Sequence, residues 1–231
     1  MDFIVKKWPA VLLLFVMLTL IFISFNRVVG GFNEYLLSKH LTYWNEQEDD
    51  PTVADVVKME RFYQTAIDNM PHDPALLQLG GHLSEWQAYI AEDDHKEQYF
   101  SEALVRYRLS IKERPTWPYT WFDLAKAKIR ASEVDDEFKS ALRTTMRLGP
   151  NERKLQIGIL QLGLLTWIEL DEQTQGIVMG VVNVVMQREP KKLYLAVEKY
   201  NRVELLCSLV SGDVWLDLEC SKFVELTNIE Q

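Results

Sequence analysis

The sequence predicts an all-α protein in which a single N-terminal transmembrane helix precedes a solenoid of paired helices. Three observations predict this class: a long uncharged apolar run near the N-terminus, apolar residues spaced three and four apart after Pro51, and prolines that recur along the rest of the chain. We therefore divide the 231 residues into a membrane anchor (1–31), an interfacial segment and linker (32–55) and a helical domain (56–231).

The anchor is a run of about 20 residues without a charged side chain, from Trp8 to Asn26, which is enough for a helix to cross a bilayer. A cleaved signal peptide is the alternative, but its apolar region is about 7–15 residues long and ends in a small-x-small cleavage site. The run here is longer and ends in FNRVV (25–29), with no Ala-x-Ala site. We expect an uncleaved anchor whose helix is broken by Gly30 and Gly31.

The charges around the anchor predict its orientation. Lys6 and Lys7 precede the apolar run, whereas Arg27 is the nearest cation after it and acidic residues follow. Positive residues favour the cytoplasmic flank. We expect a bacterial inner-membrane protein with a cytoplasmic N-terminus and a periplasmic body.

The chain has two cysteines, Cys207 and Cys220. In an oxidising compartment they could form a disulfide, which would contribute about 3 kcal/mol through the loop that it closes. Two buried reduced cysteines are the alternative, because spacing alone does not show whether two Cβ atoms meet.

The charge balance limits the classes of partner. With 25 basic and 34 acidic residues, the formal net charge is −9. A protein that binds the phosphate backbone needs a basic face, so we expect no nucleic-acid partner. The acidic balance also argues against binding of the body to anionic lipid headgroups. The membrane contact is therefore assigned to the N-terminal helix.

Prolines punctuate the helical pattern. Pro71, Pro115 and Pro150 each follow a stretch with helical apolar spacing. Pro74 and Pro118 come three residues after the first two and are expected to open new helices, because the first turn does not need the missing N–H.

The segment that follows Pro118 reads WxxLA from Trp121, and Pro115 and Pro150 lie about one 34-residue repeat apart. In these features the chain resembles the tetratricopeptide repeat, which is a pair of antiparallel helices. The resemblance implies that Trp121 packs between paired helices. An ordinary helical bundle whose prolines end its helices is the alternative.

The chain departs from the repeat pattern in three places. The spacing from Pro71 to Pro115 is too long, and we expect the extra residues to form a loop at residues 92–96. The tyrosine expected in the first helix is replaced by Lys128 in the best repeat and by Ser84 in the earlier one. Residues 193–218 are expected to cap the solenoid.

In tetratricopeptide arrays the first helix of each pair lines a concave groove. The resemblance therefore implies a partner-binding groove lined by Tyr119, Phe122, Lys126, Arg130, His82, Glu85 and Trp86. Aromatic faces and single charges suit a peptide tail or a sugar ring. The alternative for Trp86 and Phe122 is a place in the core, where large apolar side chains usually lie.

Residues 114–121, RPTWPYTW, are the densest cluster of aromatic residues and prolines in the chain. Together with the single anchor and the short repeat array, this segment resembles the VpsP-type exopolysaccharide biosynthesis proteins. These are small bacterial inner-membrane proteins associated with polysaccharide synthesis and secretion. The resemblance implies a role in making or exporting a surface polysaccharide, and it implies no catalytic residues.

No local pattern predicts chemistry. The sequence contains no zinc, calcium, nucleotide or nucleophile-elbow motif, and His82 with Glu85 is too small a set for a metal site. We expect a non-enzymatic adaptor for polysaccharide synthesis or export, with no cofactor and no metal. The alternatives are a general periplasmic scaffold or chaperone beside a translocase or maturation complex, and a carbohydrate-modifying enzyme whose site is not local in sequence.

Overall fold

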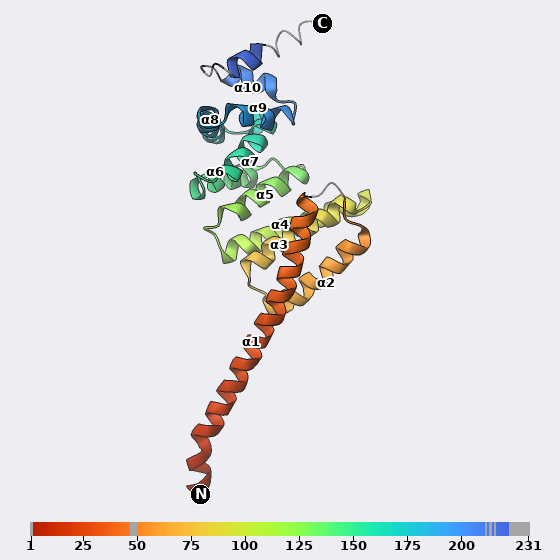
Figure 1. Ribbon diagram of the computed structural model, residues 1–231, viewed down its shortest axis with the longest axis vertical. Coiled ribbons are helices and arrows are strands. Elements are labelled where there is room, and N and C mark those ends of the chain that lie inside the picture. Colours follow the sequence, from red (N-terminus) through yellow and green to blue (C-terminus); the bar gives the residue numbers. More distant parts are fainter. Residues whose placement is uncertain (1, 47–49, 211, 213, 215, 222–231) are drawn as a thin grey trace. The chain divides into compact units, whose positions relative to one another are not determined.

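The computed structural model describes residues 2–46, 50–210, 212, 214 and 216–221, and within these ranges every regular element is a helix (Figure 1). The helical elements confirm the predicted all-α class, and within each compact unit consecutive helices pack against one another. The chain forms two compact units, Met1–Arg114 and Pro115–Gln231. The boundaries 1–31, 32–55 and 56–231 stay predictions.

Unit 1 contains α1 (Asp2–Glu46), α2 (Val53–Asn69), α3 (Pro74–Ile90) and α4 (Asp93–Glu113). The C-terminal part of α1 packs against α2 and α3, and α3 in turn packs against α4. The long N-terminal part of α1 extends away from the other helices of this unit (Figure 1). By length and composition, the stretch from Ala10 suits a membrane span or a signal sequence, and none of its most apolar window is buried by protein.

Helix α1 runs without interruption through Gly30 and Gly31, so the predicted helix break is wrong. Gly30 instead permits close packing: a Cβ added there would lie 2.9 Å from Cγ of Met70, at the end of α2. The cost of glycine in a helix is about 1 kcal/mol per residue, and packing against a neighbouring helix readily outweighs it.

The last turns of α1 belong to the core of unit 1. Leu37, Leu41 and Trp44 are buried among residues of α2 and α3, including Met59 and Leu83. The segment expected to lie at the membrane interface is therefore a core helix at these positions, although Tyr43 on its other face is exposed. The capping box of Thr52 and Asp55 then starts α2.

Unit 2 is built of shorter helices. These are α5 (Pro118–Arg130), α6 (Asp136–Leu148), α7 (Arg153–Leu165), the 3₁₀ turn η1 (Trp167–Glu169), α8 (Glu172–Arg188), α9 (Pro190–Glu198) and α10 (Val203–Leu209). Helix α5 pairs with α6, and α7 pairs with α8. The first helices of the two pairs contact each other, as do the second helices, and α9 covers α7 and α8.

The prolines act as predicted. Pro74 and Pro118 occupy the first turns of α3 and α5, and Pro71, Pro115 and Pro150 lie in the turns that follow α2, α4 and α6. The predicted insertion loop at residues 92–96 is wrong, because α4 begins at Asp93. The extra residues lengthen the helices instead: α3 and α4 have 17 and 21 residues, whereas α5 and α6 have 13 each.

Lys128, at the position where the repeat pattern predicted a tyrosine, organises the turn between α5 and α6. Its side chain is 1% exposed, and its Nζ lies 2.6 Å from Glu133, 2.9 Å from Asp135 and 3.0 Å from Glu137. Burial opposes the charge, but the hydrogen bonds to these three carboxylates outweigh it and raise the pKa of Lys128 above its usual range. Asp135 also caps α6 by accepting from the N–H of Phe138.

We expect Lys128→Met to lower the free energy of unfolding of unit 2 by about 2 kcal/mol. This is less than the cost of breaking a fully buried pair, because the three carboxylates reach solvent and can be hydrated. The measurement is urea unfolding of the detergent-solubilised chain. Lys139→Met is the matched control, since Lys139 pairs with a fully exposed Asp136, and an effect as large as that of Lys128→Met would contradict the assignment.

The same cluster predicts a pH dependence. Although burial opposes ionisation, the hydrogen bonds from Lys128 and from the Phe138 N–H lower the pKa of Asp135. A carboxyl group whose pKa is lowered by folding stabilises the protein when the pH is above its pKa in the unfolded chain, about 3.9. This stabilisation is lost as the pH falls through the lower pKa of the folded state. As the pH falls from neutral to below the unfolded pKa of Asp135, the Lys128→Met protein should therefore lose less of its free energy of unfolding than the parent protein.

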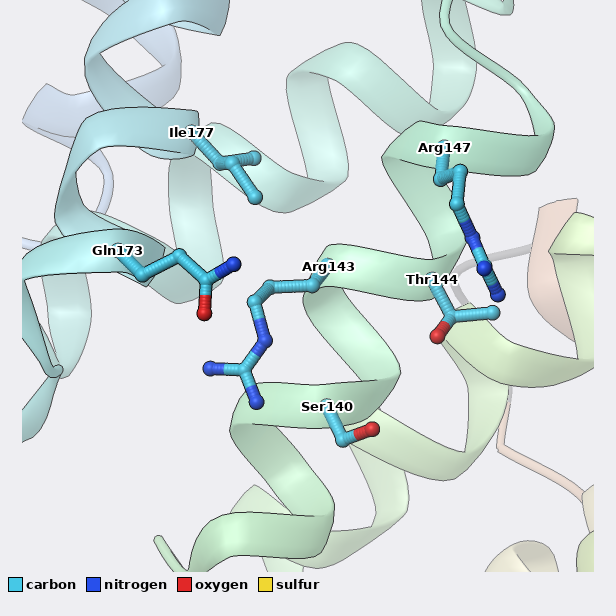
Figure 2. Close-up of a pocket in the computed structure, with 6 residues that line it drawn as sticks. All are labelled: Ser140, Arg143, Thr144, Arg147, Gln173 and Ile177. Carbon is cyan, nitrogen blue, oxygen red and sulfur yellow. The ribbon is translucent and has the colours of Figure 1, made fainter.

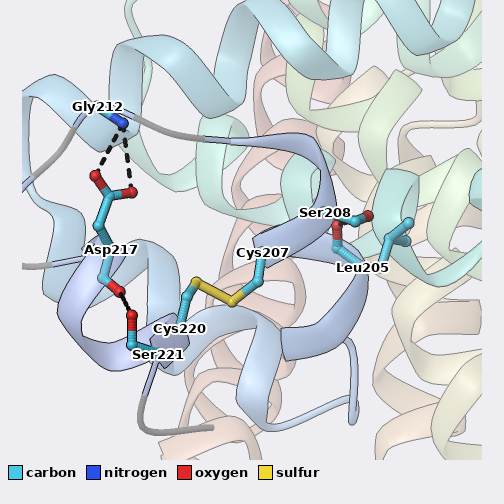
Figure 3. The surroundings of a disulfide bond; sticks show 7 residues. All are labelled: Leu205, Cys207, Ser208, Gly212, Asp217, Cys220 and Ser221. Carbon is cyan, nitrogen blue, oxygen red and sulfur yellow. Dashed lines mark hydrogen bonds between the residues drawn. A yellow bond between two sulfur atoms is a disulfide. The ribbon is translucent and has the colours of Figure 1, made fainter. Parts of the chain in front are cut away.

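A disulfide joins Cys207 of α10 to Cys220, with 5.6 Å between the two Cα atoms (Figure 3). The structure thus decides between the two alternatives that spacing left open. Inside the loop, the N–H of Gly212 donates to the carboxylate of Asp217, and the φ angle of +102° at Gly212 is one that favours glycine. The disulfide holds the last described residues against α10.

Candidate functional site

The groove residues predicted on α3 serve the packing of unit 1. Trp86 packs edge-on against Trp44, with ring centroids 5.7 Å apart, which agrees with the alternative of a core role. Glu85 is buried, 4.0 Å from Nδ1 of His82. That nitrogen is hydrogen-bonded to the hydroxyl of Tyr107 on α4, at 3.0 Å. His82 and Glu85 therefore lie together, in contact with the next helix.

The groove residues predicted on α5 are divided between packing and surface. The ring of Phe122 packs directly on Gly158 of α7, where an added Cβ would overlap it. Lys126 pairs with Asp123 at 3.4 Å, and Arg130 is exposed. Trp121, expected in the core, is only half-buried, and its indole N–H donates to the carbonyl of Pro115.

Tyr119 forms part of an aromatic pair at the surface of unit 2. Its ring centroid lies 5.3 Å from that of Trp117, which is 40% exposed. The Tyr119 hydroxyl donates to the carboxylate of Glu152 at 2.8 Å, and this hydrogen bond raises the pKa of Tyr119. The groove residues predicted on α3 and those predicted on α5 belong to different compact units.

Another site, which the sequence analysis missed, lies between α6 and α8. It is an open cleft of about 380 Å³, lined by Ser140, Arg143, Thr144, Arg147, Gln173 and Ile177 (Figure 2). The four residues of α6 recur three and four positions apart, so they share one face of the helix. The Arg143 side chain extends between the two helices, where Gln173 and Ile177 project from α8.

Arg143 is held in place by the start of α8. Its Nη1 donates to the carboxylate of Asp171 at 2.9 Å and to the hydroxyl of Thr174 at 2.8 Å. Asp171 also caps α8 by accepting from the Thr174 N–H, and this bond, together with those from the Thr174 hydroxyl and Arg143, lowers the pKa of Asp171. One guanidinium is thus positioned at neutral pH by an ionised carboxylate.

The other polar groups of the cleft are available to a ligand. Within the part of the chain that the structure describes, the side chains of Ser140, Thr144, Arg147 and Gln173 have no hydrogen bond or ion pair. Each of them carries at least one N–H or O–H donor. The cleft therefore combines two guanidinium groups with several donors that no protein acceptor uses.

A sequence signal for this site existed. Lys139, Arg143 and Arg147 recur every four residues on a chain with a net charge of −9, and this spacing places a basic stripe along one helix face. The two cleft residues on α8 could not be predicted in the same way, because Gln173 and Ile177 are uncharged and do not form a recurring pattern in the sequence.

Among the residues that the structure describes, no group of three or more histidine, cysteine, aspartate or glutamate side chains could hold a metal ion. A scan against models of protein families and searches of curated proteins and of solved structures found no match. The candidate site therefore stands on the geometry of the cleft.

Proposed function

We propose that this protein is a membrane-anchored, non-enzymatic adaptor in bacterial surface or extracellular polysaccharide synthesis and export. It holds a helical body against the membrane and binds partner proteins of the export machinery through that body. The polysaccharide assignment rests on the resemblance of the layout and of residues 114–121 to VpsP-type proteins.

The observation that carries the adaptor function is the continuity of α1. One helix includes an apolar window that no protein covers and then buries Leu37, Leu41 and Trp44 in the body. A rigid connection of this kind positions a body relative to the bilayer, whereas a flexible linker would leave it free. The helix also continues through residues 25–31, where a signal peptide would be cut, and this favours an uncleaved anchor.

The localisation that we propose is the inner membrane, with the body in the periplasm. The cationic flank at Lys6 and Lys7 supports this orientation. The disulfide between Cys207 and Cys220 also supports it, because disulfides persist in oxidising compartments and are rare in the cytosol.

The pairing of α5 with α6 and of α7 with α8 supports a tetratricopeptide-like body, in which α5 and α7 are the first helices of two repeats. Arrays of this type recognise extended peptides, which suits an adaptor. The second candidate is a general periplasmic scaffold or chaperone beside a translocase or maturation complex, since the fold alone does not separate these roles.

The experiment that tests the proposal is photocrosslinking in cells. A benzophenone amino acid replaces Tyr119, beside the exposed Trp117, and the captured proteins are identified by mass spectrometry. We expect capture of a polysaccharide polymerase, transporter or glycosyltransferase. Asn183, an exposed residue of α8, is the control position and should not capture the same proteins.

Two outcomes would contradict the proposal. Capture of translocase subunits or of many unrelated envelope proteins would favour the scaffold or chaperone function. Capture of cytosolic proteins alone would show that the body lies on the other side of the membrane.

A further inference from the structure

We infer that the cleft between α6 and α8 is a docking site for an extended acidic peptide, in which carboxylates at alternate positions pair with Arg143 and Arg147. The cleft is formed by the second helices of the two pairs, so it is separate from the predicted groove on α5. The choice of a peptide as ligand rests on the proposed adaptor function. The binding itself is tested with purified protein, so the test does not assume that function.

The positive charge of the cleft favours the binding of an anionic ligand. Arg143 and Arg147 lie four residues apart on α6, and like charges at this spacing repel each other. Asp171 offsets only Arg143, because Arg147 has no ion pair within the described part of the chain. A ligand that brings one carboxylate to each guanidinium group relieves this repulsion. Guanidinium groups also match carboxylates in geometry, since both are planar and can form paired hydrogen bonds.

The spacing of Arg143 and Arg147 along α6 matches the spacing of alternate residues in an extended peptide. Four residues of helix separate them by about 6 Å along the axis of α6. Residues at alternate positions of an extended chain are about 6.6 Å apart and point to the same side. A peptide lying along α6 with acidic residues at positions i and i+2 therefore places one carboxylate opposite each arginine. Adjacent acidic residues would point to opposite sides and reach only one arginine.

The rest of the lining suits the same ligand. The hydroxyls of Ser140 and Thr144 and the amide of Gln173 can donate to carboxylate or backbone carbonyl oxygens, and Ile177 offers an apolar contact. From Ser140 to Arg147 the cleft extends along two turns, about 10 Å of helix, which exceeds the span of a single phosphate group.

The test uses the full chain, purified in a non-ionic detergent, and fluorescein-labelled peptides at low ionic strength, where charge pairs are least screened. The probe is Gly-Glu-Ser-Glu-Gly. One control peptide, Gly-Ser-Glu-Glu-Gly, keeps the composition and charge but makes the acids adjacent. A second, Gly-Gln-Ser-Gln-Gly, removes both charges. Fluorescence anisotropy measures the dissociation constant of each peptide.

We expect the alternating acidic peptide to bind at least tenfold more tightly than either control. Arg147→Gln should weaken its binding tenfold or more without affecting the fold, because this exposed side chain makes no hydrogen bond or ion pair with any described residue. Arg143→Gln should act in the same direction. Arg188→Gln, which removes an exposed arginine of α8 outside the cleft, is the matched control and should leave the affinity unchanged.

Three outcomes would overturn the inference: equal affinity for the alternating and adjacent acidic peptides, equal weakening by Arg188→Gln, and binding of a galacturonate trimer or of inorganic phosphate in place of the peptide. None of these outcomes contradicts the proposed function, and binding of galacturonate would agree with a role in polysaccharide export, so the inference can fail while the proposed function stands. Conversely, the result of the peptide-binding experiment is independent of which proteins the crosslinking captures.

Discussion

Gly81→Ala is expected to lower the free energy of unfolding of unit 1 by about 2 kcal/mol. A Cβ at this position would overlap the ring of Tyr107, which is fully buried against α3 and has no space into which to move. The neighbouring Gly80 meets the ring of Tyr63 from α2 in the same way. The two glycines thus let α2 and α4 approach α3 closely on its two sides. Alanine is favoured over glycine in a helix by about 1 kcal/mol. The overlap with Tyr107 must therefore cost more than this for Gly81→Ala to destabilise the protein.

The control for Gly81→Ala lies in the same unit. Gly31→Ala places its Cβ in open space, with no atom within 4 Å apart from its chain neighbours and the nearby backbone of its own helix, and should stabilise α1 by up to about 1 kcal/mol. Hydrogen exchange in the detergent-solubilised chain measures both effects, through the backbone amides of α3 and α4 for Gly81→Ala and those of α1 for Gly31→Ala. If the two variants change protection in the same direction, close helix packing does not explain Gly81.

Trp44→Ala is expected to destabilise unit 1 by about 3 kcal/mol, because a large buried aromatic side chain is lost and a cavity remains. Trp44 is buried at the end of α1 and packs edge-on against Trp86 of α3. The change should also loosen the connection between the apolar part of α1 and the rest of unit 1, on which the proposed function depends. The measurement is hydrogen exchange of the amides of α2 and α3, which should open more readily.

Tyr43→Ala is the matched control for Trp44→Ala. It removes an aromatic side chain from the adjacent position of the same helix, but Tyr43 is 54% exposed, so its loss should change stability by no more than about 0.5 kcal/mol. Similar effects of the two variants would show that the end of α1 is not part of the core.

Signals that act over a few residues predicted the all-α class correctly. The helical apolar period predicted the helices, and Pro74 and Pro118 open helices as expected, because proline fits the first turn. The errors arose where distant residues decide the outcome. Gly30 stays helical because it faces Met70, and residues 93–96 extend α4 instead of forming a loop. Local propensity is weaker than packing against a neighbouring helix.

The candidate sites show the same division. The predicted groove residues were chosen by their register on one helix, which cannot show that Phe122 is packed against Gly158 or that Trp86 meets Trp44. The cleft needs α6 and α8 side by side, although Arg143 and Gln173 lie far apart in the sequence.

By itself, the sequence determined that this chain is helical, that it carries an apolar helix of membrane-spanning length, and that new helices begin at Pro74 and Pro118. These features depend on composition, periodicity and the stereochemistry of proline, all of which are local. Only the tertiary structure decided that α1 continues into the core, that Cys207 meets Cys220, that Lys128 is buried among three carboxylates, and that residues of α6 and α8 line one cleft. Each of these depends on which surfaces meet when apolar faces are buried, and no short window of sequence contains that information.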